Sequence, residues 1–420
     1  MAAASDPRRE PLWTWQFILL LASAVFMYVT TFMLTPTLPL FAQSSGAGTV
    51  AVGGLIIAVY TLGSLLPRVL WGGLTDRWGR RPVYLIGALT MTVISPLFIV
   101  FAALPAIVGL RFVQGTGFSA SSTAASTMAA DLAPASRRAE GIGYYTLANT
   151  VGMAIGPDLG LRVLQARGSN WLFATSTLAG LAALSIGLFI SYEKTRRSHH
   201  PIVVSGDTPS AELTAAPQGH GRLLERSVLP TCLVFLFVVA PYGAIMAYIA
   251  SYGLNRGVGD IGLYFTVFAL ALFVVRLGVG RVSDRHGHTV VLIPGMAAMI
   301  AGLVVLWWAD SLPVFLISAV LFGLGYGVVL PVLQAIAYIV CPADRRGAAS
   351  ATLFATADIA YGLGAVVLGL AITYLGYPAA FAGLCLLVVL ALVLFLVVLR
   401  PRLLARHTTT ASPNQEALTT

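Results

Sequence analysis

Arg68-Val-Leu-Trp-Gly72-Gly-Leu-Thr-Asp76-Arg77-Trp-Gly79 decides the fold, because its spacing returns 208 residues later as Arg276-Leu-Gly-Val-Gly280-Arg-Val-Ser-Asp284-Arg285-His-Gly287. The same offset carries Pro134-x-x-Arg137-Arg138 to Pro342-x-x-Arg345-Arg346. Two charged segments, separated by two apolar ones and copied without a gap, predict a duplicated membrane bundle. In such a bundle two similar halves surround one central site.

The composition excludes an ordinary water-soluble protein. The mean hydropathy is +0.86, and only 10% of the residues are charged, against about 25% in soluble domains. The net charge of +9 does not predict a nucleic-acid partner, because the cations lie in short segments between apolar runs, which is a topology signal. A duplicated bundle of this kind is typical of secondary transporters.

The apolar runs predict an all-α membrane protein with twelve spans in two pseudo-symmetric bundles of six helices. Each run is long enough for the roughly 20 residues that cross a bilayer. The predicted units are an N-terminal bundle at 1–192, a linker at 193–226, a C-terminal bundle at 227–400 and a tail at 401–420. The run from Pro11 to Leu40 is read as the first span, because it is too long for the apolar part of a signal peptide.

The distribution of basic residues predicts the orientation. With twelve spans, nineteen of the 25 lysines and arginines fall in segments on the side of the N-terminus. The opposite side holds only Arg162, Arg167 and Arg256. Positive charge accumulates in cytoplasmic loops, so both termini are predicted to be cytoplasmic.

Several motifs carry a resemblance to a known family. The segment Gly72 to Arg81 resembles the cytoplasmic loop signature of the major facilitator superfamily, and the repeat, spans and linker extend the resemblance over the whole chain. Arg111-x-x-Gln114-Gly115-x-Gly117 resembles a motif of proton-coupled members. Gly152-x-x-x-Gly156-Pro157-x-x-Gly160 resembles the antiporter motif, although Leu161 follows where a second glycine is usual. Thr35-Pro36-x-Leu38-Pro39 resembles the first span of drug and metabolite exporters.

The resemblance implies the twelve-span, proton-coupled antiporter branch of that family. The expected function is export of a drug, sugar or carboxylated metabolite through alternating access, driven by the proton gradient and needing no other cofactor. Proton-coupled uptake of a sugar or organic acid is the alternative, and a metallophore is a further possible exported substrate. Abundant Arg, Ala and Gly with a single lysine, Lys194, resemble proteins of high-GC bacteria, so a bacterial inner membrane is expected.

The charged loops are predicted to set the conformational balance. Asp76 and Asp284 can accept hydrogen bonds from a neighbouring helix N-terminus, and Arg68 and Arg276 lie two turns earlier on the same helices. The alternative is that these charges act only as topology signals. The other predicted loop-motif residues are Gly72, Arg77, Gly79, Arg80, Gly280, Arg285, Gly287, Arg137, Arg138, Arg345 and Arg346.

Embedded polar residues are the candidates for coupling and substrate binding. Arg111 must face the bundle interior, because an unpaired charge in hydrocarbon is costly; it stays protonated, so it tunes a nearby carboxylate or holds an anionic group. Asp358, in the eleventh span, is the candidate for a coupling or substrate carboxylate, and a purely structural bond is the alternative. Asp158 has Arg162 one turn later, so a simple ion pair is the alternative for it. Gln114 and Asn149 complete the candidates. Cavity lining is also proposed for Tyr144, Tyr145, Tyr242, Tyr248, Tyr252, Tyr326 and Gln334, with a packing role as the alternative for each.

Other functional classes lack the residues that they require. All six histidines lie in predicted loops or tails, so no embedded catalytic triad or metal cluster is available. The single lysine leaves no phosphate-binding G-x-x-x-x-G-K loop. A channel or a transport-dead sensor remains as an alternative. The predicted partners are a small-molecule substrate and the lipid bilayer, without nucleic acid or metal, and the protein is predicted to be a monomer and not an enzyme.

Overall fold

The computed structural model describes residues 11–46, 48–191, 225–342 and 345–401 of the 420-residue chain. Those residues form helices joined by short turns, with no strand among them. The predicted linker at 193–226 and the tail at 401–420 lie outside the described residues, apart from 225, 226 and 401. The domain boundaries therefore stay predictions.

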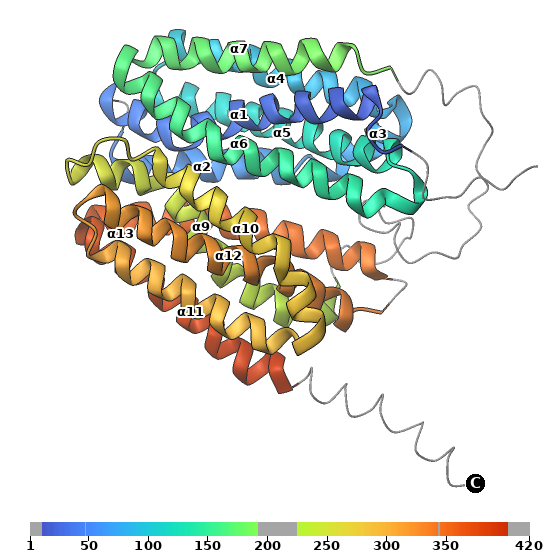
Figure 1. The fold of residues 1–420 in the computed structure, drawn as a ribbon. Coiled ribbons are helices and arrows are strands. Elements are labelled where there is room, and N and C mark those ends of the chain that lie inside the picture. The colour runs from blue at the N-terminus through green and yellow to red at the C-terminus, as the bar shows by residue number, and fades with distance from the viewer. Residues whose placement is uncertain (1–10, 47, 192–224, 343–344, 402–420) are drawn as a thin grey trace, which may run out of the picture.

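The helices of the first half lie together in the blue-to-green part of Figure 1. Pro67 separates α2 from α3, because proline cannot donate the next helical hydrogen bond; Val50–Trp78 is nevertheless long and apolar enough to cross a membrane as one unit. The bounds are α1 (Trp15–Ser44), α2 (Val50–Leu65), α3 (Arg68–Trp78), α4 (Arg80–Val100), α5 (Leu104–Leu132), η1 (Ala135–Arg137), α6 (Arg138–Arg167) and α7 (Ser169–Leu188).

The helices of the second half form the yellow-to-red group in Figure 1. The apolar runs of both halves form helices because a backbone in hydrocarbon must satisfy its own hydrogen bonds. The bounds are η2 (Arg226–Val228), α9 (Leu229–Asn255), α10 (Leu263–His286), α11 (His288–Trp307), α12 (Leu312–Val340), α13 (Arg346–Leu394) and a π-helical turn, η4 (Phe395–Leu399).

Nine helical stretches of the described chain are long and apolar enough to cross a membrane. α5 and α6 are not among the nine, because both are rich in glycine and hydroxyl residues. Ala348–Leu399 counts once, although Gly376 interrupts it with non-helical angles. The all-helical membrane fold is confirmed, whereas the number of twelve spans stays a prediction.

Glycines at positive φ mark the turns of the repeat. Gly79 (φ 97°) separates α3 from α4, and Gly287 (φ 87°), 208 residues later, separates α10 from α11. Gly168 (φ 84°) separates α6 from α7, and Gly376 (φ 77°), at the same offset, divides α13 into two arms. Only glycine adopts these angles without strain, so the duplication extends to the turns.

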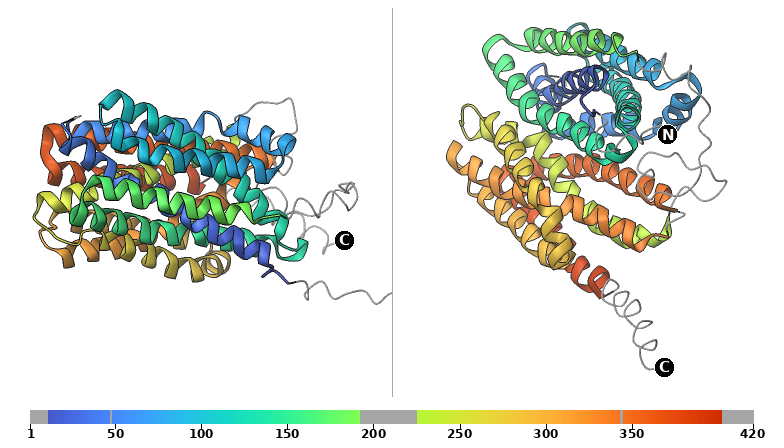
Figure 2. Two further views of the ribbon diagram at one scale, coloured as in Figure 1. Left: turned by 90° about the horizontal axis from the view of Figure 1, so that it is seen from above. Right: turned by 45° about the vertical axis from the view of Figure 1, so that its right-hand side comes forward.

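Two seams join the halves. In the first seam, α2 and the start of α3 face α13; in the second seam, α10 packs against α6. Because α2 corresponds to the start of α10 and α6 to the first arm of α13 at the 208-residue offset, the two seams are equivalent positions of the repeat. The right-hand view of Figure 2 shows the two groups of helices side by side from a further direction.

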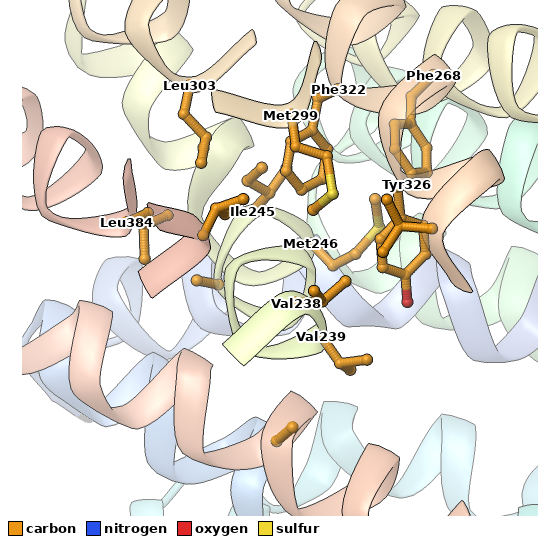
Figure 3. Close-up of a cluster of buried hydrophobic side chains, with 14 of the residues drawn as sticks. Val238, Val239, Ile245, Met246, Phe268, Met299, Leu303, Phe322, Tyr326 and Leu384 are labelled. Carbon is orange, nitrogen blue, oxygen red and sulfur yellow. The ribbon is translucent and has the colours of Figure 1, made fainter. Parts of the chain in front are cut away.

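Each half has a buried apolar core of its own. The largest cluster is built mainly from α9 to α13, and two smaller clusters belong to α1 to α7. In Figure 3, Leu384 and Tyr326 lie at opposite ends of the part of the large cluster that is drawn. Tyr326 also lines the cavity between the halves, so the packed core of the second half supports one wall of that cavity.

Candidate functional site

A cavity of about 260 Å³ lies between the halves. α1, α2, α5 and α6 line it from one side, and α9, α10, α12 and α13 line it from the other. The volume is close to the lower end of the roughly 300–1,000 Å³ typical of small-molecule sites. Among the candidate residues, Asn149, Tyr242, Tyr326 and Asp358 line it. The predicted lining residues that do not are Tyr144, Tyr145, Tyr248, Tyr252 and Gln334.

Aromatic rings form much of the wall from the second half. Tyr242 of α9 stacks on Tyr326 of α12, with ring centroids 4.5 Å apart and planes 18° apart. It also contacts Tyr361 of α13, with centroids at 5.6 Å. The three rings make a continuous aromatic strip from α12 to α13, and Tyr60 and Phe118 line the cavity from the first half. Such a surface binds apolar or planar ligand groups.

The first seam carries an ion pair at the cavity. Arg68, the first residue of α3, lies 3.0 Å from a carboxylate oxygen of Asp358 on α13. Arg68 also donates a hydrogen bond to the Ser64 hydroxyl at 3.1 Å. The structure therefore places Arg68 beside the proton candidate Asp358, and the pair joins the two halves. Sequence reasoning associated Arg68 with Asp76 and the charged loops instead.

The second seam carries a cation without a carboxylate. Arg276 of α10 lines the cavity near the aromatic strip. It makes no ion pair and no hydrogen bond with any residue that the structure describes. The sequence signal for this difference was the 208-residue offset itself, which pairs Arg68 with Arg276 and Asp358 with Thr150. Extending the repeat to the lining residues would have found it.

The offset relates the other cavity residues as well. Phe118 corresponds to Tyr326, Met153 to Tyr361 and Ser64 to Leu272, and all six line the cavity. The site is therefore a two-fold arrangement in which individual positions have diverged in chemistry. The half that supplies α9 to α13 contributes the hydroxyls of Tyr242, Tyr326 and Tyr361. The polar groups from α1 to α7 include Tyr60, Ser64, Asn149 and Thr150.

Arg111 is buried between helices rather than exposed to the cavity. Its side chain is 1% exposed; it donates hydrogen bonds to Gln114 Oε1 at 2.7 Å and to the Leu34 carbonyl at 3.1 Å. Its guanidinium lies over the Tyr60 ring, 4.8 Å from the centroid, which is a cation–π contact. In the part of the chain that is described, Arg111 makes no ion pair. Tyr60 separates it from the space where a substrate fits.

Asp158 makes the ion pair with Arg162 that its spacing allows, at 2.9 Å. Arg162 also lies 3.4 Å from Asp260, which precedes α10, so this cation bridges the two halves. Asp158 does not line the cavity. Gly262 packs against Asp158 so closely that a Cβ there would collide with it.

The glycines of the antiporter-like motif form a face against α1. A side chain at Gly152 would meet Tyr28, one at Gly156 would meet Phe32 and Met33, and one at Gly160 would meet Met33 and Thr37. Small residues at this spacing let two membrane helices approach closely. Pro157 lies inside α6 without interrupting it. The motif therefore acts here in the packing of α6 on α1.

The charged loops make contacts mainly within their own half. Arg80 at the start of α4 pairs with Asp131 at the end of α5, at 2.8 Å, and Arg137 forms a two-point ion pair with Glu140. Arg345 lies 3.2 Å from Glu225. The Ser227 amide donates a hydrogen bond to Glu225 and, with Arg345, holds the pKa of that carboxyl below its usual range.

The remaining loop-motif residues are exposed or outside the description. Asp76 is exposed and accepts no hydrogen bond or ion pair from any described residue. Arg77 and Arg285 are exposed, Arg138 is partly buried, and a Cβ at Gly72 or Gly280 would meet open space. The side chains of Asp284 and Arg346 lie outside the described residues. The predicted contact of Asp76 with a helix N-terminus is thus absent from this conformation.

The comparisons with known proteins agree with the fold. The family model of the Major Facilitator Superfamily matches residues 20–259 and 233–419. The chain therefore belongs to this superfamily of membrane transporters, as its loop signature predicted, and no catalytic family is indicated.

Particular relatives show how far the likeness extends. An uncharacterized MFS-type transporter of Burkholderia mallei (strain SAVP1) is 26% identical over 385 residues, covering 90% of each chain. The staphylopine export protein of Staphylococcus aureus is 22% identical over 362 residues, covering 84% of this chain and 89% of that protein. A crystal structure of the nucleoside transporter NupG has a similar fold, with a TM-score of 0.71 at 13% identity, covering 90% of this chain and all of that one.

Proposed function

We propose that this protein exports a small organic molecule across the bacterial cytoplasmic membrane in exchange for protons. The cavity between the halves binds the substrate, and the halves expose it to the two sides in turn. The proton gradient supplies the energy without a cofactor, and both termini lie in the cytoplasm. The observation that carries the proposal is the ion pair between Arg68 and Asp358, because it joins the halves at the cavity wall.

The ion pair couples protonation to the position of the halves. Ionised Asp358 attracts Arg68 across the first seam, at 3.0 Å. A proton on Asp358 removes this attraction and leaves Arg68 without its partner, which is costly in a poorly solvated site. A proton therefore shifts the balance between two arrangements of the halves, which is the requirement for coupling. Arg111 cannot take this role, because guanidinium stays protonated.

Contacts between the halves support closure of one end of the cavity. The Tyr248 hydroxyl donates to the Val50 carbonyl at 2.9 Å, and the Thr266 hydroxyl donates to the Ala154 carbonyl at 2.8 Å. These contacts and the Arg162 bridge lie at the end of the molecule where α2 begins. The predicted topology makes this the external end. The exposed Asp76, at the opposite end, agrees with a cavity that opens toward the cytoplasm.

Two observations support export over uptake. The staphylopine export protein is similar to this chain over most of both lengths. In addition, the close packing of α6 on α1 uses the glycine spacing of the antiporter-like motif. Uptake by proton symport is the outcome that would replace this proposal.

The test measures proton movement in inside-out membrane vesicles that contain the protein. With the lumen acidic, candidate drugs, sugars and carboxylated metabolites are added one at a time. The expected result is substrate-dependent alkalinisation of the lumen that disappears in Asp358→Asn. Acidification that follows substrate movement in the same direction would establish symport and overturn the assignment of export.

A further inference from the structure

We infer that the transported molecule carries a carboxylate that binds Arg276, and that this group supplies the acid which the second seam lacks. The inference rests on the proposed function, since it identifies the class of substrate for the same cavity. Its basis is the comparison of Arg68 and Arg276, two arginines that occupy equivalent positions of the repeat.

The first seam shows what such an arginine requires. Arg68 lies at the junction of the halves, and Asp358 on the facing helix neutralises it at 3.0 Å. At the 208-residue offset, Arg276 takes the place of Arg68, and Thr150 of α6 takes the place of Asp358. Both residues of the second pair line the cavity, and their helices pack together. The fold thus places an arginine at the same position of each seam, but a carboxylate faces it only in the first seam, among the residues that the structure describes.

Nothing in the described chain replaces the missing acid. Asp358 and Arg276 are the only ionisable residues among the cavity's lining residues other than tyrosines, and Asp358 is already paired with Arg68. The two acids on α6 are already paired outside the cavity, Glu140 with Arg137 and Asp158 with Arg162. A cation in a poorly solvated site without a partner is costly. A bound anion at this position removes that cost.

The neighbours of Arg276 suit a carboxylate on a compact molecule. A guanidinium binds a carboxylate through two parallel hydrogen bonds. Asn149, next to Thr150, also lines the cavity, and its amide is a further donor from the first half. A carboxylate between Arg276 and Asn149 would bridge the halves, as Asp358 does in the first seam. The stacked rings of Tyr242 and Tyr326, which line the same cavity, would contact the apolar or planar part of the molecule.

Binding of a carboxylate at Arg276 would also link the substrate-bound state to the protonation state of Asp358. With Asp358 ionised and a monocarboxylate on Arg276, both arginines at the seams are paired, so the cavity can close without an unpaired charge. With Asp358 protonated and no substrate, neither arginine has its partner. The two states differ in both seams, which links release of the substrate to arrival of the proton.

The experiment uses the purified full-length protein in detergent, so that binding is measured without a proton gradient. Thermal stabilisation is recorded for a panel of small aliphatic, aromatic and amino-acid carboxylates, each beside its uncharged amide. At least one carboxylate should stabilise the wild-type protein while its amide does not. Arg276→Gln should weaken that binding about 30-fold or more, the usual result of leaving a buried charged group unpaired.

The decisive variant places a carboxylate side chain at position 150, where it can take the place of the substrate carboxylate. Thr150→Asp should pair with Arg276, raise the melting temperature of the ligand-free protein and abolish binding of the carboxylate. Thr150→Asn, which has a similar size but no charge, should do neither. The rise should disappear when Arg276→Gln is added to Thr150→Asp, which shows that the gain comes from that pair.

The outcomes separate this inference from the proposed function. Stabilisation by amides as strongly as by acids, binding that survives Arg276→Gln, or no response to any carboxylate would overturn the carboxylate assignment. If the carboxylate binds as expected but its transport moves no protons in vesicles, the substrate class stands and proton antiport fails. If protons are exchanged for neutral or cationic molecules instead, the function stands and the substrate class fails.

Discussion

The two seams of this transporter occupy equivalent positions of the sequence repeat, but their charged residues differ. In the first, Arg68 lies 3.0 Å from Asp358; in the second, the equivalent positions are Arg276 and Thr150, and both line the cavity. The packing has changed less than the charges. Gly54 contacts Ala365 and Val366 in the first seam, and Gly262 contacts Asp158 at the equivalent place in the second.

The difference between the seams suits two separate roles in one duplicated bundle, proton binding in one seam and substrate binding in the other. Close backbone packing is kept in both seams, as closure of the cavity at one end would require. The charged positions have diverged, and in the two proposals above the acid of the first seam binds the proton and the cation of the second seam binds the substrate. One seam is therefore proposed to respond to protons and the other to the substrate.

Asp358→Asn should have the largest effect on this comparison. The variant keeps the shape of the side chain but removes the charge, so the first seam no longer responds to protonation. Transport driven by a pH gradient should fall to background in vesicles, while equilibrium binding of substrate stays measurable. Thr150→Asn, the matched change in the second seam, should retain pH-driven transport. Equal loss in both variants would mean that the seams do not differ in this way.

Alanine at Gly54 or at Gly262 should hinder closure of the external end. The added Cβ meets backbone or side-chain atoms in both seams, and such overpacking costs roughly 1–3 kcal/mol. A cavity probe, Thr35→Cys in a background without Cys232, Cys341 and Cys385, should become more reactive toward an impermeant maleimide from that end. Gly109→Ala, where the Cβ meets open space, is the control and should leave the labelling unchanged.

Replacing Arg68 should lower the stability of the ligand-free protein, whereas replacing Arg276 should not. Arg68→Gln leaves Asp358 without its partner and should cost about 1–3 kcal/mol, less than for a fully buried pair because both side chains are partly exposed. Arg276→Gln removes an unpaired cation, so the apparent melting temperature in detergent should stay the same or rise. A large fall for Arg276→Gln would show that an acid already neutralises it.

Arg162→Gln should have the smallest effect. Its contacts with Asp158 and Asp260 cross the second seam, but the Arg162 side chain is 49% exposed, and such pairs contribute about 0.2–1 kcal/mol. The fall in melting temperature should be small and should shrink at high salt, where exposed charges are screened. A fall that is large and independent of salt would assign this bridge a role equal to that of the Arg68 pair.

Much of the fold followed from local chemistry. Apolar runs predicted the helical membrane protein, and the repeated charged segments coincide with the turns at Gly79 and Gly287 that end α3 and α10. The helix count was less secure, because the glycine and hydroxyl content of α5 and α6 obscures their hydropathy. Asp158 and Arg162 pair as their spacing allows, since contacts within one helix depend only on its pitch.

The sequence by itself determined the class of protein, its duplicated plan and the few charged groups in its membrane interior, because periodicity and hydropathy act residue by residue. The tertiary structure decided which of those charges meet. Arg111 proved to bind Gln114 and Leu34 within the first half, while Arg68 reaches Asp358 from 290 positions away. Pairings across such distances depend on how helices pack in space, and the assembled seams show that Arg276 has no carboxylate partner among the described residues.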